Sequence, residues 1–386
     1  MHSISFIDPP ESSVDILVIA GEVSGDEHAS ILVENLLKDF PHLKISALGG
    51  MSLKSKGAHL IYPLIDHAVV GLFEVLKNYF LFKNLFSKTI LWIKKFRPKL
   101  ILLVDYPGFN LRLAKELKKI EISVKGGGEV KVLQYISPQL WAWKPKRRFM
   151  MEKVLDGLAV IFKFELKCYQ DTSLPVAFVG HPFVSVNFKK KIFYDPNGSL
   201  LILPGSRVQP VQRILPVFLD TYEMLLLKFP TLKAEIPVPD QKIRKTVETI
   251  LKTRSDLKKG IRIIENFSKL NVCAALMSSG TMSFECAIAG IPGVIGYRSH
   301  PLTYYIGRKL VKIQNLGMAN ILLSDKPPYK EFLQNAANKA NLKNALDEIL
   351  NDDNISNYYK RVSDDLLQLL RAPEDISVDK WLLAEL

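Results

Sequence analysis

An acidic residue ends an apolar run in the segment LILLVDYPGFN, residues 100–110. Asp105 follows five apolar residues typical of a buried strand, and Pro107 and Gly108 then turn the chain toward a helical pattern that begins at Asn110. Because Asn110 can cap that helix, the Asp105 carboxylate is left at the carboxyl end of the strand. A carboxylate there can act as a general base on a bound ligand. The other interpretation is a loop carboxylate that caps the helix.

Three further strand exits carry residue types that suit a phosphorylated ligand. AGEVSGD, residues 20–26, and SSGTMSFE, residues 278–285, place small residues before a helix, whose free amides and dipole favour anions. In the second of these segments, Glu285 could accept ribose hydroxyls. The third exit, LLILPGSR, residues 200–207, ends in Arg207, whose forked guanidinium suits a diphosphate. Each exit also has an ordinary interpretation as a capped turn, and none matches a P-loop or GxGxxG fingerprint.

An aromatic and basic cluster follows another predicted strand, in YISPQLWAWKPKRR, residues 135–148. Trp141 and Trp143 stand beside four Lys and Arg residues. Such a cluster can stack on nucleic acid, and it suits an acidic, partly apolar ligand as well.

The elements that must position these residues alternate between short apolar runs and helical patterns. Continuous apolar strands separated by helices predict a parallel sheet that is covered on both faces. The alternation stops at a basic, turn-rich stretch, 187–199, and then restarts, so we expect two doubly wound α/β domains over 1–186 and 187–365. An amphipathic helix in 366–386 is expected to pack back on the first domain. The predicted strands are 15–20, 43–48, 100–104, 130–136, 157–161, 176–179, 200–205, 234–238, 261–265, 272–278 and 292–297.

Charge and composition limit the binding partners and the cellular compartment that we expect for the protein. The 386 residues carry a net charge of +13, which implies anionic company such as phosphorylated metabolites, nucleic acid or an acidic membrane surface. Residues 69–96 interleave aromatic and aliphatic side chains with lysines, which fits either a membrane interface or amphipathic core helices. Cys168, Cys273 and Cys286 form no CxxC pair and indicate reduced thiols. With no secretory signal and no spanning stretch, we expect a cytoplasmic protein.

Taken in order, the motifs AGEVSGD, GLFEVL, VDYPGFN, YISPQLWAWKPKR, FVGHP, LPGSR, SSGTMSFE and GYRSHPLTYYIGRKLVK resemble those of the lipid-A-disaccharide synthase family. The resemblance runs from about Ile16 to Asn320. It implies a GT-B fold, in which two Rossmann-like domains face a cleft. It also implies that Asp105 is the general base. The substrate-binding residues that it implies are Glu22, Ser24, Gly25, Asp26, Glu74, Asn110, Trp141, Trp143, Arg207, Ser279, Gly280, Thr281, Glu285, Tyr297, Arg298 and Asn320.

The sequence departs from the family pattern at three positions. Gly108 stands where the family often has an acidic residue, Pro210 stands where a Glu is usual, and Asn335 replaces the Glu of a Gln-Glu pair. A second carboxylate in the Asp105 loop is therefore absent, and a nucleotide contact at either of the other two positions is in doubt.

The reaction implied by the resemblance joins UDP-2,3-diacylglucosamine to 2,3-diacylglucosamine 1-phosphate, called lipid X, with inversion and release of UDP. No cofactor and no metal are expected. The implied partners are the two substrates and the anionic cytoplasmic face of the inner membrane, not nucleic acid, and the oligomeric state is left open, a homodimer included. The alternatives are a UDP-sugar 2-epimerase or a glycosyltransferase with a polyprenyl-linked acceptor on the same fold. A non-enzymatic membrane or nucleic-acid binding protein is the remaining alternative.

Overall fold

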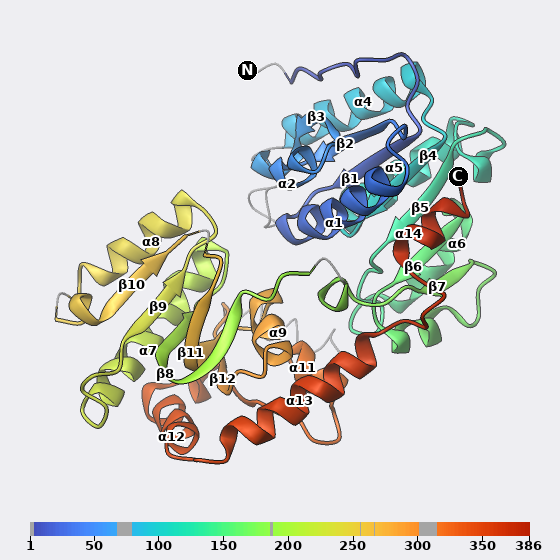
Figure 1. The fold of residues 1–386 in the computed structure, drawn as a ribbon. Coiled ribbons are helices and arrows are strands. Elements are labelled where there is room, and N and C mark those ends of the chain that lie inside the picture. Colours follow the sequence, from blue (N-terminus) through green and yellow to red (C-terminus); the bar gives the residue numbers. More distant parts are fainter. Residues whose placement is uncertain (1–3, 68–78, 186–187, 255, 266, 301–314) are drawn as a thin grey trace. The chain divides into compact units, whose positions relative to one another are not determined.

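The computed structural model describes residues 4–67, 79–185, 188–254, 256–265, 267–300 and 315–386. The chain divides into two compact units (Figure 1). Unit 1 comprises Met1–Phe188 and Leu370–Leu386, and unit 2 comprises Lys189–Leu369. Each unit is a parallel sheet with helices connecting its strands, so the prediction of two Rossmann-like, doubly wound α/β units is confirmed.

Unit 1 is built on a seven-stranded sheet with the order β3-β2-β1-β4-β5-β6-β7. Every residue of the central strands β1 and β4 is buried, because helices cover both faces of a doubly wound sheet. In parallel register Ile16 lies opposite both Ile45 and Leu100. The strands are β1 (Ile16–Ala20), β2 (Ile45–Gly49), β3 (His59–Pro63), β4 (Leu100–Val104), β5 (Lys131–Tyr135), β6 (Gly157–Val160) and β7 (Val176–Phe178).

The helices of unit 1 connect these strands and cover the faces of the sheet. Helix α5, which follows β4, begins at Pro107 rather than at Asn110, because the fixed φ of proline suits the first helical position. Asn110 therefore lies inside the first turn, and the prediction that it caps this helix is wrong. The α-helices are α1 (Val23–Asp39), α2 (Met51–Ser55), α4 (Tyr79–Phe96), α5 (Pro107–Lys119) and α6 (Arg148–Val154).

Unit 2 repeats the scheme with a six-stranded sheet of order β10-β9-β8-β11-β12-β13. Its strands are β8 (Ile192–Leu203), β9 (Ala234–Pro237), β10 (Ile261–Ile264), β11 (Leu270–Met277), β12 (Gly293–Tyr297) and β13 (Lys330–Leu333). Its helices are α7 (Val208–Leu226), α8 (Gln241–Leu251), α9 (Thr281–Ile288), α11 (Met318–Leu322), α12 (Lys339–Leu350) and α13 (Ile355–Leu370).

The stretch expected to be a linker, 187–199, belongs in part to the sheet of unit 2. Strand β8 begins at Ile192, which pairs with Leu270, and it rejoins β11 at Ser199 after an irregular excursion. The sequence DPNG, 195–198, is typical of a turn, so the apolar pattern alone does not predict that the residues before it pair with β11. A Cβ on Gly198 would lie 2.6 Å from the Asn271 carbonyl oxygen, so only glycine allows the strands to approach here.

The chain returns to unit 1 after α13, and its last helix, α14 (Val378–Leu383), packs there as predicted. The Leu370 carbonyl accepts a hydrogen bond of 2.9 Å from the His181 backbone N–H. Near the end of the chain, the Lys131 ammonium lies 3.1 Å from the Glu385 carboxylate. In Figure 1 the red end of the chain lies beside β5 and α6 of unit 1.

Helix α4 is the described part of the lysine-rich aromatic segment 69–96. Its inner face packs Leu85, Trp92 and Ile93 into the core of unit 1, while Phe80 and Leu91 are 81% and 63% exposed. It is therefore an amphipathic helix that covers the sheet. Across the described residues, no helix is long and apolar enough to cross a membrane. The predicted binding residue Glu74 lies outside the described residues.

Candidate active site

Asp105 lies directly after β4 in an unusual backbone conformation. Both Asp105 and Tyr106 have φ of 44°, in the left-handed region, where a non-glycine residue costs about 1–3 kcal/mol. The Asp105 backbone N–H still donates a 3.0 Å hydrogen bond to the Tyr135 carbonyl of β5. The Tyr106 ring lies against Gly21, where an added Cβ would come within 2.1 Å of it. The turn is thus held by its neighbours rather than by its own preference.

Two buried amide side chains, Asn110 and Gln134, hold the carbonyl of Asp105; we call them the amide clamp. Asn110 Nδ2 donates to the Asp105 carbonyl at 2.8 Å, and Gln134 Nε2 donates to the same oxygen at 3.2 Å. Both side chains are fully buried. Asn110 also donates to the Val104 carbonyl at 3.2 Å, and Gln134 to the Ile136 carbonyl at 3.1 Å. The clamp therefore joins the ends of β4 and β5 around the candidate base.

The surroundings of Asp105 favour its neutral form more than water does. Burial raises the pKa of Asp105 to about 7, and the negative charge of Glu22 acts in the same direction, against a hydrogen bond from the Tyr106 backbone. Glu22 stands at the N-cap of α1. A carboxylate with a pKa near neutrality can accept a proton and release it again, which suits a general base.

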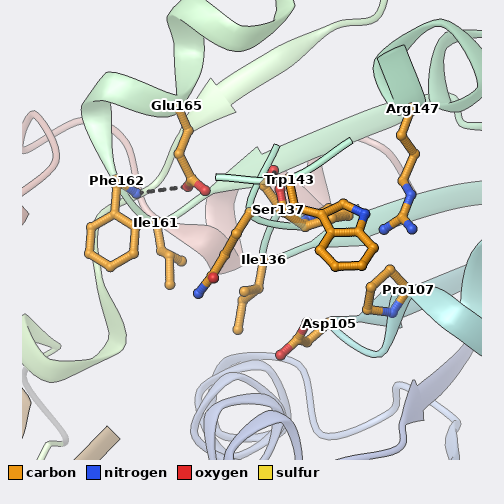
Figure 2. A pocket seen from close by; sticks show the side chains of 11 residues that line it. Asp105, Pro107, Ile136, Ser137, Trp143, Arg147, Ile161, Phe162 and Glu165 are labelled. Carbon is orange, nitrogen blue, oxygen red and sulfur yellow. Dashed lines mark hydrogen bonds between the residues drawn. The ribbon is translucent and has the colours of Figure 1, made fainter. Parts of the chain in front are cut away.

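Asp105 lines a cavity of about 330 Å³ in unit 1 (Figure 2). The cavity lies where β4, β5 and β6 end, the edge at which doubly wound sheets bind ligands. Its walls combine carboxyl groups with apolar, aromatic and basic side chains, namely Asp105, Pro107, Ile136, Ser137, Pro138, Gln139, Trp143, Arg147, Ile161, Phe162 and Glu165. The geometry suits a ligand that carries hydroxyls, apolar surface and negative charge.

Glu165 is the site residue that the sequence interpretation missed. It lies on the 3-10 helix η4 (Lys163–Tyr169) and is only 2% exposed. Burial and the charge of Asp105 raise the pKa of Glu165 to about 8, although N–H groups of Phe162, Trp141 and Ile161 oppose this rise. The sequence feature that could have identified Glu165 is its position five residues after the end of β6, at a strand exit like those of β1 and β4.

The tryptophans of the aromatic cluster differ in their surroundings. The Trp141 ring packs edge-on against Phe164, with 5.5 Å between ring centroids. Trp143 is 42% exposed, and the Lys144 ammonium lies 5.0 Å from its ring centroid. Trp143 is among the residues that line the cavity, and Trp141 is not.

The residues of the glycine-rich exit of β1 have two different roles: Asp26 orders the backbone, and Glu22 acts on Asp105 through its charge. Asp26 is 2% exposed, and its carboxylate accepts the backbone N–H groups of Gly50 at 2.7 Å and Ser52 at 3.0 Å. It thus caps α2 and has no oxygen aimed at the cavity of Asp105. Ser24 and Gly25 lie in the first turn of α1. Of this exit, Glu22 acts on Asp105, because its negative charge raises the pKa of the Asp105 carboxyl.

In unit 2 the predicted residues lie at the ends of β8, β11 and β12. Arg207 is exposed at the N-cap of α7, and Gly280 and Thr281 are exposed at the start of α9, with Ser279 half-buried before them. Glu285 is half-buried on α9, and Tyr297 ends β12. This end of the sheet presents a cation and free helix amides, which suits an anion.

Two other predicted residues of unit 2 are engaged within the unit. Asn320 is fully buried, and its Nδ2 donates to the Tyr329 carbonyl at 2.8 Å and to Glu331 at 2.7 Å. Its Oδ1 accepts the Tyr329 N–H at 2.9 Å. Arg298 Nε donates to the Gln334 carbonyl at 3.3 Å. Asn320 therefore orders the segment before β13, and Arg298 is tied to the loop after it.

The three departures from the family pattern lie in open or locally bonded surroundings. An added Cβ at Gly108 would meet nothing within 4 Å, and Asn335 is exposed. Pro210 lies in the first turn of α7, where a missing N–H leaves no bond unmade.

For metals, the part of the chain that the structure describes holds no group of three or more His, Cys, Asp or Glu side chains suited to an ion.

A family model described as lipid-A-disaccharide synthetase matches residues 16–385. The chain belongs to the lipid-A-disaccharide synthase family. It is 36% identical to lipid-A-disaccharide synthase 1 of Legionella pneumophila, over 88% of each chain. It is 33% identical to the Coxiella burnetii lipid-A-disaccharide synthase, over 89% of this chain and 90% of that one. The lipid-A-disaccharide synthase of Geobacter metallireducens is 31% identical over 347 residues.

Solved structures support the fold of this family member. A putative UDP-N-acetylglucosamine 2-epimerase from Listeria monocytogenes superposes with a TM-score of 0.62, at 10% identity, over 96% of this chain and 95% of that chain. The glycosyltransferase of kitacinnamycin superposes with a TM-score of 0.59, at 10% identity, over 97% and 99%. Such low identities show the GT-B type of fold alone. The family itself makes this chain a glycosyltransferase of lipid A biosynthesis.

Proposed function

We propose that this enzyme joins UDP-2,3-diacylglucosamine to lipid X and releases UDP and the β-1,6-linked disaccharide 1-phosphate, with inversion at the anomeric carbon. Membership of the lipid-A-disaccharide synthase family supports the reaction class. We assign acceptor binding to unit 1 and UDP-sugar binding to unit 2. The assignment rests on the buried carboxyls of the first and the exposed Arg207 and helix amides of the second.

One observation carries the mechanism: Asp105 lines the cavity with a pKa raised to about 7. In the proposed step, an acceptor hydroxyl gives its proton to Asp105 while its oxygen bonds to the anomeric carbon. The bond from that carbon to UDP breaks, and its electron pair leaves with the diphosphate. The transition state is oxocarbenium-like, as in glycoside hydrolysis.

The leaving diphosphate gathers negative charge during this step. Arg207 and the amides that open α9 are the groups of unit 2 that we assign to it, because preorganised cations and helix N-termini stabilise charge that develops in a transition state. The roles of Ser279, Gly280 and Glu285 as donor contacts remain part of this proposal.

We also propose that the enzyme works peripherally on the anionic cytoplasmic face of the inner membrane. The outer face of α4 supports this, because exposed Phe80 and Leu91 stand with the exposed lysines Lys83, Lys94 and Lys95. Apolar side chains flanked by lysines suit an interface with anionic lipid.

The direct test is incubation of the purified protein with UDP-2,3-diacylglucosamine and lipid X, with the disaccharide followed by mass and UDP by a coupled assay. Disaccharide and UDP in equal amounts are expected. UDP without disaccharide would indicate hydrolysis or epimerisation, and a product only with a polyprenyl-linked acceptor would indicate the other transferase. No product from active substrates would contradict the proposal.

A further inference from the structure

The cavity of unit 1 holds two carboxyl groups, although the proposed reaction uses one base. Asp105 enters after β4, and Glu165 enters from η4 after β6, with the exit of β5 between them. Figure 2 shows the two side chains on different elements of the same group of lining residues. A second buried carboxyl beside a base is costly unless it has a task, because burial favours its neutral form.

One task of Glu165 is visible within η4. Its Oε2 accepts the backbone N–H of Phe162 at 3.3 Å, as in a capping box. Another buried capping carboxylate of unit 1, Asp26, accepts the backbone N–H groups of Gly50 and Ser52 and is not among the residues that line the cavity. Capping alone therefore does not explain why Glu165 lines the cavity.

The chemistry of the two carboxyls is complementary. An ionised Asp105 only accepts hydrogen bonds, whereas a neutral Glu165 carries a donor hydrogen as well as accepting oxygens. A sugar hydroxyl does both. A hydroxyl between these groups can therefore donate its proton to Asp105 and receive a hydrogen bond from Glu165, which fixes its direction before attack.

Resting on the proposed function, we propose that Glu165 binds the acceptor sugar as a neutral carboxyl, and so orients it for Asp105. The ligand class is a hydroxyl-bearing sugar of the acceptor, not the diphosphate of the donor. Because Arg147 lines the same cavity, the phosphate of such an acceptor would find a cation there.

The ionisable groups that surround Glu165 come from three elements. Among the described residues these are Asp105 after β4, Arg147 on η3, and Cys168 and Tyr169 on its own helix. Burial raises the pKa of both carboxyls, and the charge of Asp105 raises the pKa of Glu165 further. An ionised Asp105 therefore favours the protonated form of Glu165.

The test measures KM for lipid X, KM for the UDP-sugar and kcat from pH 6 to 9. In the wild type, kcat should fall below about pH 7 as Asp105 takes up its proton, and KM for lipid X should rise above about pH 8 as Glu165 ionises. Glu165→Gln keeps a neutral side chain that can cap η4 and donate. It should raise this KM only a few-fold and remove its rise at alkaline pH.

Glu165→Leu removes both hydrogen-bonding functions and should raise KM for lipid X about tenfold or more, with little change in KM for the UDP-sugar. Glu152→Leu is the matched control, because it removes a carboxylate of the same unit that accepts a backbone N–H away from the cavity. It should lower the melting temperature without altering KM for lipid X.

An alkaline rise that persists in Glu165→Gln, or an unchanged KM in folded Glu165→Leu, would overturn the inference while leaving the reaction intact. If the wild type forms no disaccharide, the proposed function itself fails. Binding of lipid X in detergent micelles to wild type and Glu165→Leu, measured without donor, then decides the inference: equal affinities overturn it, and a loss of about tenfold supports it.

Discussion

The carboxyl edges of the two sheets share a topology and differ in the groups they place there. In unit 1 the edge buries titratable side chains, Asp105 and Glu165, and raises the pKa of both. In unit 2 the edge exposes Arg207, Gly280 and Thr281 around two helix N-termini. Burial changes protonation, whereas exposed cations and amides attract anions without changing it. The same fold thus provides one edge suited to proton transfer and one suited to holding a diphosphate.

The backbones at the exits of β4 and β8 also differ. Unit 1 places Asp105, Tyr106 and Ile136 at positive φ, where a side chain is strained. At the exit of β8 unit 2 uses Gly205, with φ of 108°, although Gln334 after β13 is a non-glycine residue with φ of 52°. A strained aspartate needs support from its surroundings, which the amide clamp supplies, while a glycine turn needs none.

The largest expected effect comes from Asp105→Asn, which keeps the shape of the side chain and removes the base. Turnover should fall about 10²- to 10⁴-fold, because general base catalysis contributes that much, while UDP affinity should hardly change. Steady-state kinetics and titration with UDP check this. Near-normal turnover in the variant would show that the edge of unit 1 does not carry the base.

The second effect should appear in unit 2. Arg207→Ala should lower kcat/KM for the UDP-sugar about 100-fold, because a charge-assisted contact to a diphosphate is lost. Arg207→Lys should recover part of the loss, since the charge returns without the fork. Arg213→Ala, farther along α7, serves as the control. Equal effects of the two alanine variants would remove Arg207 from the donor site.

A smaller effect is expected from the amide clamp. Gln134→Met keeps the volume and removes the donor to the Asp105 carbonyl, so kcat should fall about tenfold with both KM values nearly unchanged, and stability by about 1–3 kcal/mol. Thr221→Val in unit 2 removes another buried donor, to the Val217 carbonyl, and should lower stability without lowering kcat. Similar kcat values in the two variants would contradict a positioning role.

The smallest effect concerns stability against pH. The folded pKa of Asp105, about 7, lies above the ordinary value of 3.8, so its contribution is fully present below pH 3.8 and is lost as the pH rises through 7. Asp105→Asn should therefore raise the melting temperature of unit 1 by about 5 °C at pH 8. The difference should shrink toward pH 5. Calorimetry of the wild type and the variant from pH 5 to 8 checks this, and an equal difference at both ends of the range would contradict it.

Strand exits were predictable from the sequence because each is marked locally, by an apolar run that ends in small or charged residues. That reasoning located Asp105 and the alternation of both sheets. It missed β3 and β13, two of the four strands that lie at sheet edges. An edge strand is buried on fewer sides, so its sequence carries a weaker pattern.

The role of a polar side chain was predictable only where its partner is near in sequence. Asp26 bonds to the backbone of Gly50, and the amide of Asn110 reaches the Ile19 carbonyl of β1. Such partners are set by the folded sheet. A buried polar residue that is satisfied by a distant backbone group therefore looks, in the sequence, like one that faces a ligand.

The return of Leu370–Leu386 to unit 1 has a consequence for synthesis on the ribosome. The chain emerges from its first residue to its last, so unit 2 has all of its residues before unit 1 has received its final helix and the Lys131–Glu385 ion pair. The half that begins first is therefore finished last. Until residues 370–386 have emerged, the surface of β5 and β6 against which this segment packs stays uncovered.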